Sequence, residues 1–372
     1  VALVARGEDV HVEVLGAPSL DDPTPLWRDA IFRIASLTKP IAGAGAMALV
    51  DEGVLSLDDP VEMYLPELAN RRVLRRLDGP LDDTVPAERS ITVDDILTFR
   101  LGFGSIMESP RSYPIQIAEE ELQLATLGPP WPPPPFTSDE WIARFATLPL
   151  LHQPGAEWRY NTGAQVLGVL LERATGQPLE TFVRSRLFEP LGMMDTALSV
   201  PVDKQSRFTT AYMPDEESGT LRLLDPPVGG WWNEPPAMAN AAGMLVSTLD
   251  DYWSFDPMLL AGATHDGEQV LSPEAIAAMT RDHLTAEQRE SAQFFLRPYW
   301  GWGYRMAAPG PVTGQPPVPW GFGWNGGTGT TWHSDPARGL TAILLTQRGM
   351  NSPEPPAVFT DFWDATYSAI ER

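Results

Sequence analysis

Strand patterns occupy the first residues of the chain. Residues 1–6 form a short apolar run, and valines alternate with polar residues over 10–14. Both patterns predict strands, and the turn-forming residues 7–9 between them predict a hairpin. A further brief apolar run at 31–35 leads into Ser36. The chain is therefore expected to open with strands.

Strand patterns return near residue 300. They cover 300–306, 321–333 and 340–346, and residues 335–339 have the composition of a turn between the last two. An antiparallel hairpin is expected there. The pattern ends with an amphipathic stretch at 358–370, which predicts a helix.

The middle of the chain has helical patterns. Residues 41–50 are small or apolar on nearly every side, which predicts a buried helix that stops at Gly53. Further helices are expected at 92–100, 165–174, 179–187, 247–253 and 272–279. The proline-rich run 128–136 fits neither a helix nor a central strand, and a stiff polyproline II loop is expected there.

These patterns predict an α/β fold that is assembled from both ends of the chain. Residues 1–55 and 295–372 are expected to form the α/β sheet domain. Residues 56–294 are expected to form a mainly helical domain with proline-rich loops.

Composition narrows the class of protein. The 372 residues are 43% hydrophobic and 20% charged, which is globular usage. A formal net charge of −23 repels phosphate backbones and anionic lipids, so neither nucleic acid nor a membrane is expected as a partner. No apolar run approaches the roughly 18 residues of a bilayer span. Because residues 1–4 are too short for a signal peptide, a cytoplasmic location is expected, with secretion after removal of a leader as the alternative.

Cysteine is absent from the chain, and the histidines are few. The absence of cysteine excludes disulfides, thiolate nucleophiles and cysteine-bound metals. No two of the five histidines have the spacing of metal ligands. We therefore expect neither a metal nor a cofactor, and any nucleophile would be a Ser, Thr, Lys or carboxylate.

A serine and a lysine form the first candidate motif. The chain contains only two lysines, and one of them, Lys39, follows Ser36 by three residues at the start of the buried helix. Helical spacing places both side chains on one face, and burial lowers the pKa of a lysine towards a value useful for proton transfer. The helix N-terminus adds N–H groups that favour an oxyanion. The alternative is a helix cap with a lysine that reaches out to solvent.

A tyrosine and a glycine-rich segment add two further elements. Tyr160 lies in a turn-rich segment just before the helix at 165–174, and an ammonium beside it would push the phenol towards tyrosinate. Residues 324–329 read Trp-Asn-Gly-Gly-Thr-Gly, and the N–H of Gly327 is a candidate oxyanion donor opposite that of Ser36. Alone, Tyr160 would be a core residue and the glycines a bulge or hairpin.

In this order and spacing, the three motifs 36–39, 160–162 and 324–326 resemble those of the class C β-lactamase-like serine hydrolases. Shorter stretches also look similar, at 32–35, 97–102, 187–194 and 243–248. The resemblance implies a β-lactamase/penicillin-binding-protein-like fold, with an antiparallel sheet flanked by helices, an all-helical domain, and the site between them. It also implies that Ser36 is acylated while Lys39 and Tyr160 share the general-base role.

Two departures from the family pattern point to its family VIII carboxylesterase branch. Trp324 stands where the β-lactamases have the lysine of Lys-Thr-Gly, so an anionic β-lactam loses its main charge-assisted contact. The second motif reads Tyr-Asn-Thr rather than Tyr-x-Asn, and Asn161 is the candidate to replace the displaced amide. We expect Trp324, Asn325, Gly326 and Asn161 to bind substrate.

The expected function is hydrolysis of short- to medium-chain carboxylic esters, with a small-molecule ester as partner and the oligomeric state left open. A weak β-lactamase, a D-amino-acid peptidase or amidase, and an acyltransferase are alternatives within the same chemistry. A catalytically silent binding protein is the alternative outside it. His152 and His333 flank the second and third motifs, but without a Gly-x-Ser-x-Gly elbow they are expected to be structural.

Overall fold

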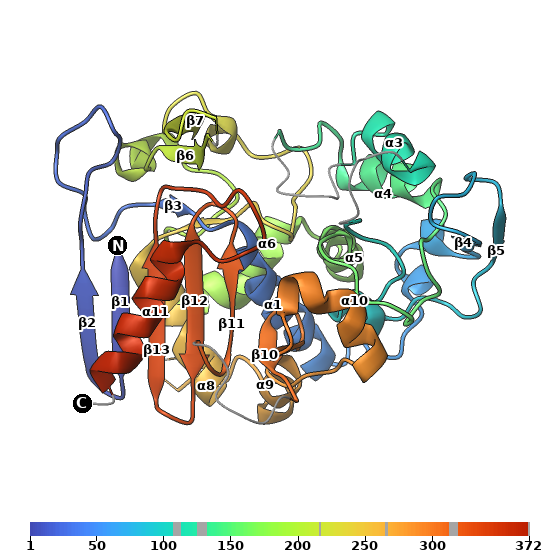
Figure 1. The fold of residues 1–372 in the computed structure, drawn as a ribbon. Coiled ribbons are helices and arrows are strands. Elements are labelled where there is room, and N and C mark those ends of the chain that lie inside the picture. The colour runs from blue at the N-terminus through green and yellow to red at the C-terminus, as the bar shows by residue number, and fades with distance from the viewer. Residues whose placement is uncertain (107–112, 125–131, 216, 265–266, 312–318, 371–372) are drawn as a thin grey trace.

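A seven-stranded antiparallel sheet joins the two ends of the chain (Figure 1). The computed structural model describes residues 1–106, 113–124, 132–215, 217–264, 267–311 and 319–370. In spatial order the strands are β2 (Asp9–Glu13), β1 (Ala2–Arg6), β13 (Leu340–Leu345), β12 (Thr330–Asp335), β11 (Phe322–Gly326), β10 (Ala307–Pro309) and β9 (Trp300–Trp302). Because β1 pairs with β13, the predicted assembly from both ends is confirmed.

The two predicted hairpins are both present. Gly7 turns β1 into β2 at φ +60°, and Gly339 turns β12 into β13 at φ +58°. Glycine adopts this left-handed backbone without the steric cost that a Cβ brings. The N–H of Gly7 also donates to the carbonyl of Gly339 (3.1 Å), which ties the two turns together.

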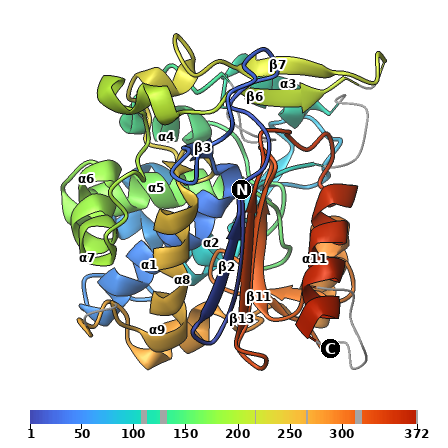
Figure 2. The same cartoon turned by 90° about the vertical axis from the view of Figure 1, so that its left-hand side faces the viewer.

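Helices cover both faces of the sheet. Helix α11 (Ala357–Ile370) lies on one face, and α1 (Thr38–Asp51) and α8 (Leu249–Ala261) lie on the other (Figure 2). Alternation along β13 sends Leu340, Ala342 and Leu344 into the cluster under α11 and the residues between them towards the other face. Both faces of this strand are therefore buried.

The remaining helices extend from α5, α6 and α9, which contact α1, to α3 and α4 at the end of the molecule opposite β2 (Figure 1). They are α2 (Val93–Leu97), α3 (Pro114–Glu121), α4 (Ser138–Ala146), α5 (Thr162–Thr175), α6 (Leu179–Val183), α7 (Glu189–Leu191), α9 (Pro273–Met279) and α10 (Ala286–Leu296). Three two-stranded ladders join β3 (Phe32–Arg33) to β8 (Val246–Ser247), β4 (Arg72–Leu74) to β5 (Thr84–Pro86), and β6 (Ala211–Pro214) to β7 (Leu221–Asp225). Short 3₁₀ turns lie at Ala35–Leu37, Val61–Met63, Pro66–Leu68, Val202–Arg207 and Trp231–Asn233, and a π-helical turn at Arg184–Phe188 follows α6.

Local signals placed the starts of helices better than their ends: the helix expected at 92–100 ends at Leu97, and the one expected at 247–253 continues to Ala261. The Thr92 hydroxyl caps α2 and that of Ser272 caps α9, at the first residues of the helices expected at 92–100 and 272–279. The strand expected over 300–306 ends at Trp302, because the chain turns there and Arg305 takes φ +75°. The proline-rich run at 128–136 begins outside the described residues.

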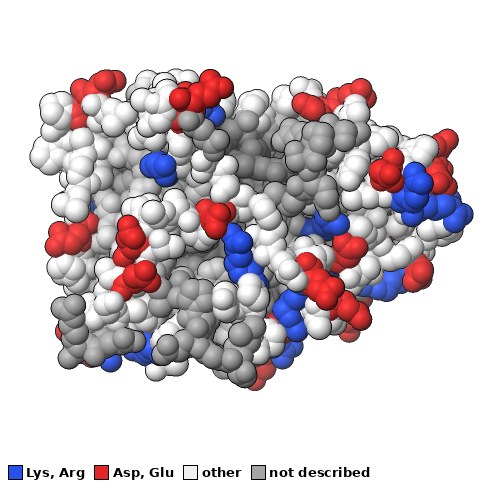
Figure 3. All heavy atoms as spheres, viewed as in Figure 1, with Lys and Arg blue, Asp and Glu red and all other residues white. Residues whose placement is uncertain are grey.

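The division into a sheet domain and a helical domain stays a prediction. Helix α8, from within 56–294, packs against β13 of the sheet, and β8 pairs with β3. None of the helices in the described part of the chain is both long and apolar enough to cross a bilayer. Acidic and basic side chains are interspersed over the face seen in Figure 3, and basic ones gather at the end that carries β4 and β5.

Candidate active site

Ser36 is partly exposed to solvent, whereas every other residue from Ala30 to Leu49 is buried. The preceding residue, Ala35, has φ +44°, a left-handed conformation that costs an alanine about 1 kcal/mol. This bend lifts Ser36 out of the buried strand–helix connection at the start of α1. A costly backbone conformation directly before a half-buried serine is typical of a functional site.

Lys39 reaches the Ser36 hydroxyl from one helical turn away. Its Nζ lies 2.8 Å from Ser36 Oγ and 2.6 Å from the carbonyl oxygen of Ala242. The side chain is fully buried, and this burial, reinforced by the charge of Arg305, lowers the pKa of Lys39 well below its usual value. An amine in this state is suited to accept the hydroxyl proton of Ser36.

Tyr160 approaches the same oxygen from the segment before α5. Its hydroxyl donates to Ser36 Oγ over 3.0 Å, and its ring centroid lies 4.6 Å from Lys39 Nζ. Burial raises the pKa of Tyr160 to about 12, although its hydrogen bonds with Ser36 and Trp324 and the charge of Arg305 act in the opposite direction. The expected shift towards tyrosinate was therefore wrong: desolvation outweighs the nearby cation, and the phenol keeps its proton at neutral pH.

Trp324, which the family resemblance aligns with the β-lactamase lysine, contacts Tyr160 directly. Its indole N–H donates to the Tyr160 hydroxyl over 2.8 Å, and only 6% of the residue is exposed. Sequence reasoning predicted Trp324 as an apolar, uncharged substitute for that lysine. It did not anticipate that Trp324 would also be a hydrogen-bond donor to the phenol.

Strand β11 is held against the residues that lead into Ser36. A Cβ on Gly326 would lie 2.4 Å from the carbonyl oxygen of Ile34, so only glycine permits this approach. Thr330 donates to that same carbonyl over 3.1 Å, and Thr328 donates to the carbonyl of Arg33. These contacts fix the position of the first motif relative to the third.

Three further residues were predicted for the site, namely Gly327, Asn325 and Asn161. The carbonyl of Gly327 accepts the N–H of Met350 over 2.8 Å, which fixes the peptide that follows β11. Asn325 is half-buried, and its Oδ1 has no hydrogen-bond partner among the described residues. Asn161 is 4% exposed with φ +86° at the start of α5. Its role in substrate binding, like that of Asn325, stays a prediction.

An aromatic shell encloses Tyr160. The shell consists of the rings of Phe99, Trp158, Phe295, Trp302 and Trp324. Their centroids lie between 4.5 and 6.4 Å from the centroid of the Tyr160 ring. Phe295 comes from α10, which the sequence did not single out. Such a shell explains why the phenol is desolvated.

Neither flanking histidine contacts the serine. His152 pairs with Glu157 over 3.0 Å, and His333 is buried between Trp300 and Trp363. Burial lowers the pKa of His333 to about 3, so it is neutral. Within the described residues no group of three or more His, Asp or Glu side chains is arranged to hold a metal ion. The cluster of serine, amine and phenol is therefore the chemical centre of the described molecule.

This fold and this cluster are those of the serine β-lactamase-like hydrolases. The chain belongs to the Beta-lactamase family, whose model matches residues 1–360. Protein Rv1367c of Mycobacterium tuberculosis (strain ATCC 25618 / H37Rv) is 40% identical over 350 residues, which cover 92% of this chain and 83% of the relative. Esterase EstB of Burkholderia gladioli is 30% identical over 379 residues, or 95% of this chain and 87% of EstB.

The solved structures include the same fold. EstCE1, described as a hydrolase with promiscuous acyltransferase activity, superposes with a TM-score of 0.78 at 22% identity and covers 98% of this chain and 92% of its own. Together with the relationship to EstB, this agrees with the family VIII esterase branch that the sequence predicted.

Proposed function

We propose that the protein is a carboxylesterase that cleaves short- to medium-chain esters of small molecules through an acyl-enzyme on Ser36. The observation that carries this proposal is the convergence of Lys39 Nζ (2.8 Å) and the Tyr160 hydroxyl (3.0 Å) on Ser36 Oγ. A serine with a buried amine beside it is an activated nucleophile. Similarity to an esterase at 30% identity supports the choice of ester over other acyl compounds.

The two bases expected to share the proton are distinguished by their pKa values. The pKa of Lys39 is lowered and that of Tyr160 is raised, so the amine accepts the Ser36 proton and the protonated phenol donates a hydrogen bond. Ser36 Oγ then bonds to the ester carbonyl carbon, and the carbonyl electron pair moves onto oxygen. The N–H groups of Ser36 and Gly327 are the proposed donors to that oxyanion.

Collapse of this intermediate breaks the bond to the alcohol oxygen, which takes the proton back from the Lys39 ammonium. Water then attacks the acyl-enzyme and gives a proton to Lys39. The Lys39 ammonium returns this proton to Ser36 Oγ as the acyl–serine bond breaks, which releases the carboxylic acid and free Ser36. The phenol of Tyr160 lies between Ser36 and Trp324, where it is placed to donate to the departing oxygen.

Trp324 favours an ester over a β-lactam as the substrate. The position that would offer a lysine to the carboxylate of a β-lactam offers instead an indole N–H that is already engaged with Tyr160. An uncharged donor contributes less to binding an anion than an ammonium does. A D-peptidase or β-lactamase activity is therefore expected to be weaker than ester hydrolysis.

The test is hydrolysis of p-nitrophenyl butyrate by the wild type and by Ser36→Ala. Loss of at least about 10³-fold in kcat is expected for the variant, because removal of a nucleophile abolishes covalent catalysis. Full activity in Ser36→Ala would reject the nucleophile. Faster turnover of nitrocefin than of simple esters would favour a β-lactamase, and ester products on addition of an alcohol would favour acyl transfer.

A further inference from the structure

Arg305 is a buried cation directly beneath the catalytic cluster. It lies in the turn between β9 and β10, with 0% of the residue exposed. Its Nη2 donates to the carbonyl of Gly163 in the first turn of α5, and its guanidinium carbon lies 4.5 Å from the ring centroid of Phe99. It therefore bridges the strands of the sheet domain to the helix that begins beside Tyr160.

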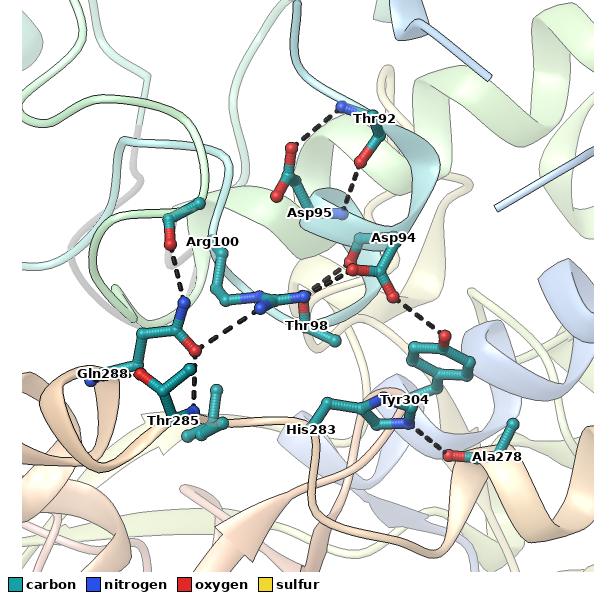
Figure 4. Close-up of polar contacts among 12 residues, drawn as sticks. Thr92, Asp94, Asp95, Thr98, Arg100, Ala278, His283, Thr285, Gln288 and Tyr304 are labelled. Carbon is teal, nitrogen blue, oxygen red and sulfur yellow. Dashed lines mark hydrogen bonds and ion pairs between the residues drawn. The ribbon is translucent and has the colours of Figure 1, made fainter. Parts of the chain in front are cut away.

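The turn that presents Arg305 is anchored on both sides. The hydroxyl of the preceding Tyr304 donates to Asp94 over 2.8 Å, and its ring stacks on His283 at 4.3 Å (Figure 4). Asp94 is also paired with Arg100 (Figure 4), and it forms no ion pair with Arg305. The position of Arg305 is thus fixed by neighbours that do not neutralise it.

Arg305 differs from the other fully enclosed arginine. Arg33 pairs with the buried carboxylate of Asp225. Arg305 has no carboxylate within ion-pair distance among the described residues, and its Nε and Nη1 have no hydrogen-bond partner there. A buried charge without a counter-charge is costly to folding, so its retention calls for a functional reason.

Helix α1 connects Arg305 to Lys39. Gly43 lies one turn after Lys39 on the same helix face, and a Cβ on Gly43 would come within 2.9 Å of Arg305 Cβ. The amine of Lys39 contacts Ser36 and the Ala242 carbonyl and lies over the ring of Tyr160. The stem of Arg305 packs against α1 one turn along, and its charge also acts on Lys39. Among the described residues none of the facing groups is a carboxylate.

We propose that Arg305 is a positioning residue for the reaction at Ser36: its uncompensated positive charge, fixed between α1 and α5, keeps Lys39 as a free amine that is ready to accept the serine proton. This inference rests on the proposed function. A neighbouring cation is a known means of keeping a lysine unprotonated at neutral pH. Because Gly43 has no side chain, the stem of Arg305 can pack directly against α1, one turn from Lys39.

The chain allows a direct test because it has only two lysines, Lys39 and Lys204. Protein labelled with ¹³C-lysine is titrated by NMR from about pH 5 to about pH 11, and Lys204→Arg assigns the two signals. The neutral variants Arg305→Met and Arg305→Gln are compared with the wild type. Arg71→Met is the matched control, since Arg71 is also buried but donates to the carbonyls of Ala146 and Leu148.

Both neutral variants are expected to raise the proton affinity of Lys39 by about tenfold or more. Lys204 is expected to titrate as in the wild type, and Arg71→Met to leave both signals in place. If Arg305→Met does not fold, the test is made with Arg305→Gln. An unchanged midpoint for Lys39 in the folded neutral variant, or an equal shift in Arg71→Met, would overturn the inference.

Reaction of Ser36 with a fluorophosphonate probe separates this inference from the proposed function. At pH 7 the neutral variants are expected to react about tenfold more slowly than the wild type and to recover at higher pH, while Arg305→Lys keeps a near-normal rate. A folded wild type that neither reacts with the probe nor hydrolyses esters would reject the function and the inference together. A wild type that does both, with an unmoved Lys39 midpoint in the variants, would reject the inference alone.

Discussion

The indole N–H of Trp324 donates a 2.8 Å hydrogen bond to the hydroxyl of Tyr160, which in turn donates to Ser36 Oγ. The residue that replaces the β-lactamase lysine therefore acts on the phenol rather than on a substrate carboxylate. The same contact gives Tyr160 a donor that polarises its hydroxyl, which strengthens the hydrogen bond that the phenol itself donates. Trp324 in place of a lysine thus removes a cation that could bind a substrate carboxylate and adds a hydrogen-bond donor to the phenol of Tyr160.

Trp324→Phe tests this contact. The variant keeps an aromatic ring and removes the N–H, so a fall of about tenfold in kcat for p-nitrophenyl butyrate is expected, the equivalent of one hydrogen bond of about 1.4 kcal/mol. Trp302→Phe is the matched control, because the buried Nε1 of Trp302 has no hydrogen-bond partner among the described residues. Equal losses in both variants would mean that ring packing, rather than the N–H, is responsible.

Lys39→Met is expected to abolish ester hydrolysis and yet stabilise the fold at neutral pH. Burial lowers the folded pKa of Lys39 below the value near 10.5 that it has in the unfolded chain. The unfolded chain therefore binds more protons between these two pKa values, and stability rises with pH there. The cost of the lysine is fully present below the folded pKa and vanishes above about pH 10.5.

Thermal unfolding measures this cost. We expect a Tm for Lys39→Met that is about 1–2 °C higher than that of the wild type at pH 7, which corresponds to about 1 kcal/mol in a chain of this size. The difference should shrink as the pH approaches 10. A lower Tm for the variant at pH 7 would show that the bonds of the amine to Ser36 and Ala242 outweigh its desolvation.

Gly326→Ala is expected to damage both stability and activity. The new Cβ would lie 2.4 Å from Ile34 O and 2.1 Å from Thr330 Oγ1, so β11 must move away from the segment that positions Ser36. A loss of about 2–3 kcal/mol in unfolding free energy is expected, as for an overpacked core. Gly243→Ala is the control: its Cβ would meet Ala35 at an ordinary 3.5 Å, and denaturant titration should find it close to wild type.

Phe295→Ala tests the aromatic shell. Its ring stacks on Tyr160 with centroids 4.5 Å apart, and removal would admit water to the phenol and reduce apolar contact around it. We expect KM for p-nitrophenyl butyrate to rise about tenfold, the effect of losing 1–2 kcal/mol of apolar burial. Phe294→Ala removes the neighbouring ring, which is 47% exposed, and should change KM little. If both variants behave alike, α10 has only a structural role.

Much of the fold followed from local pattern. Glycine turns, threonine and serine caps and alternating valines mark their own element ends, so the hairpins at Gly7 and Gly339 and the caps at Thr92 and Ser272 were predictable. The strand at 300–306 was drawn too long because nothing local shows that Arg305 turns back into the core. Its conformation is imposed by tertiary contacts with Gly163 and Phe99.

In the site, too, some features followed from sequence patterns and others depend on tertiary contacts. The spacing of Ser36 and Lys39 within one helix turn made their contact predictable, and the family pattern brought in Tyr160 across 124 residues. The direction of the Tyr160 pKa shift was not predictable, since it depends on how much of the phenol is desolvated by rings from four distant segments. Arg305 carried no signal beyond being one charged residue in an aromatic, glycine-spaced run.

The pairing of β1 with β13 has a consequence for synthesis on the ribosome. The residues paired across these strands lie more than 330 positions apart, since Arg6 faces Leu340. Emerging from the exit tunnel, the first strand has no partner until the last one follows it. Ser36, Lys39 and Tyr160 are translated long before Trp324, so a nascent chain carries its nucleophile without the strand that completes the centre. The hydrogen bond from Trp324 to Tyr160 can therefore form only after β11 has been made.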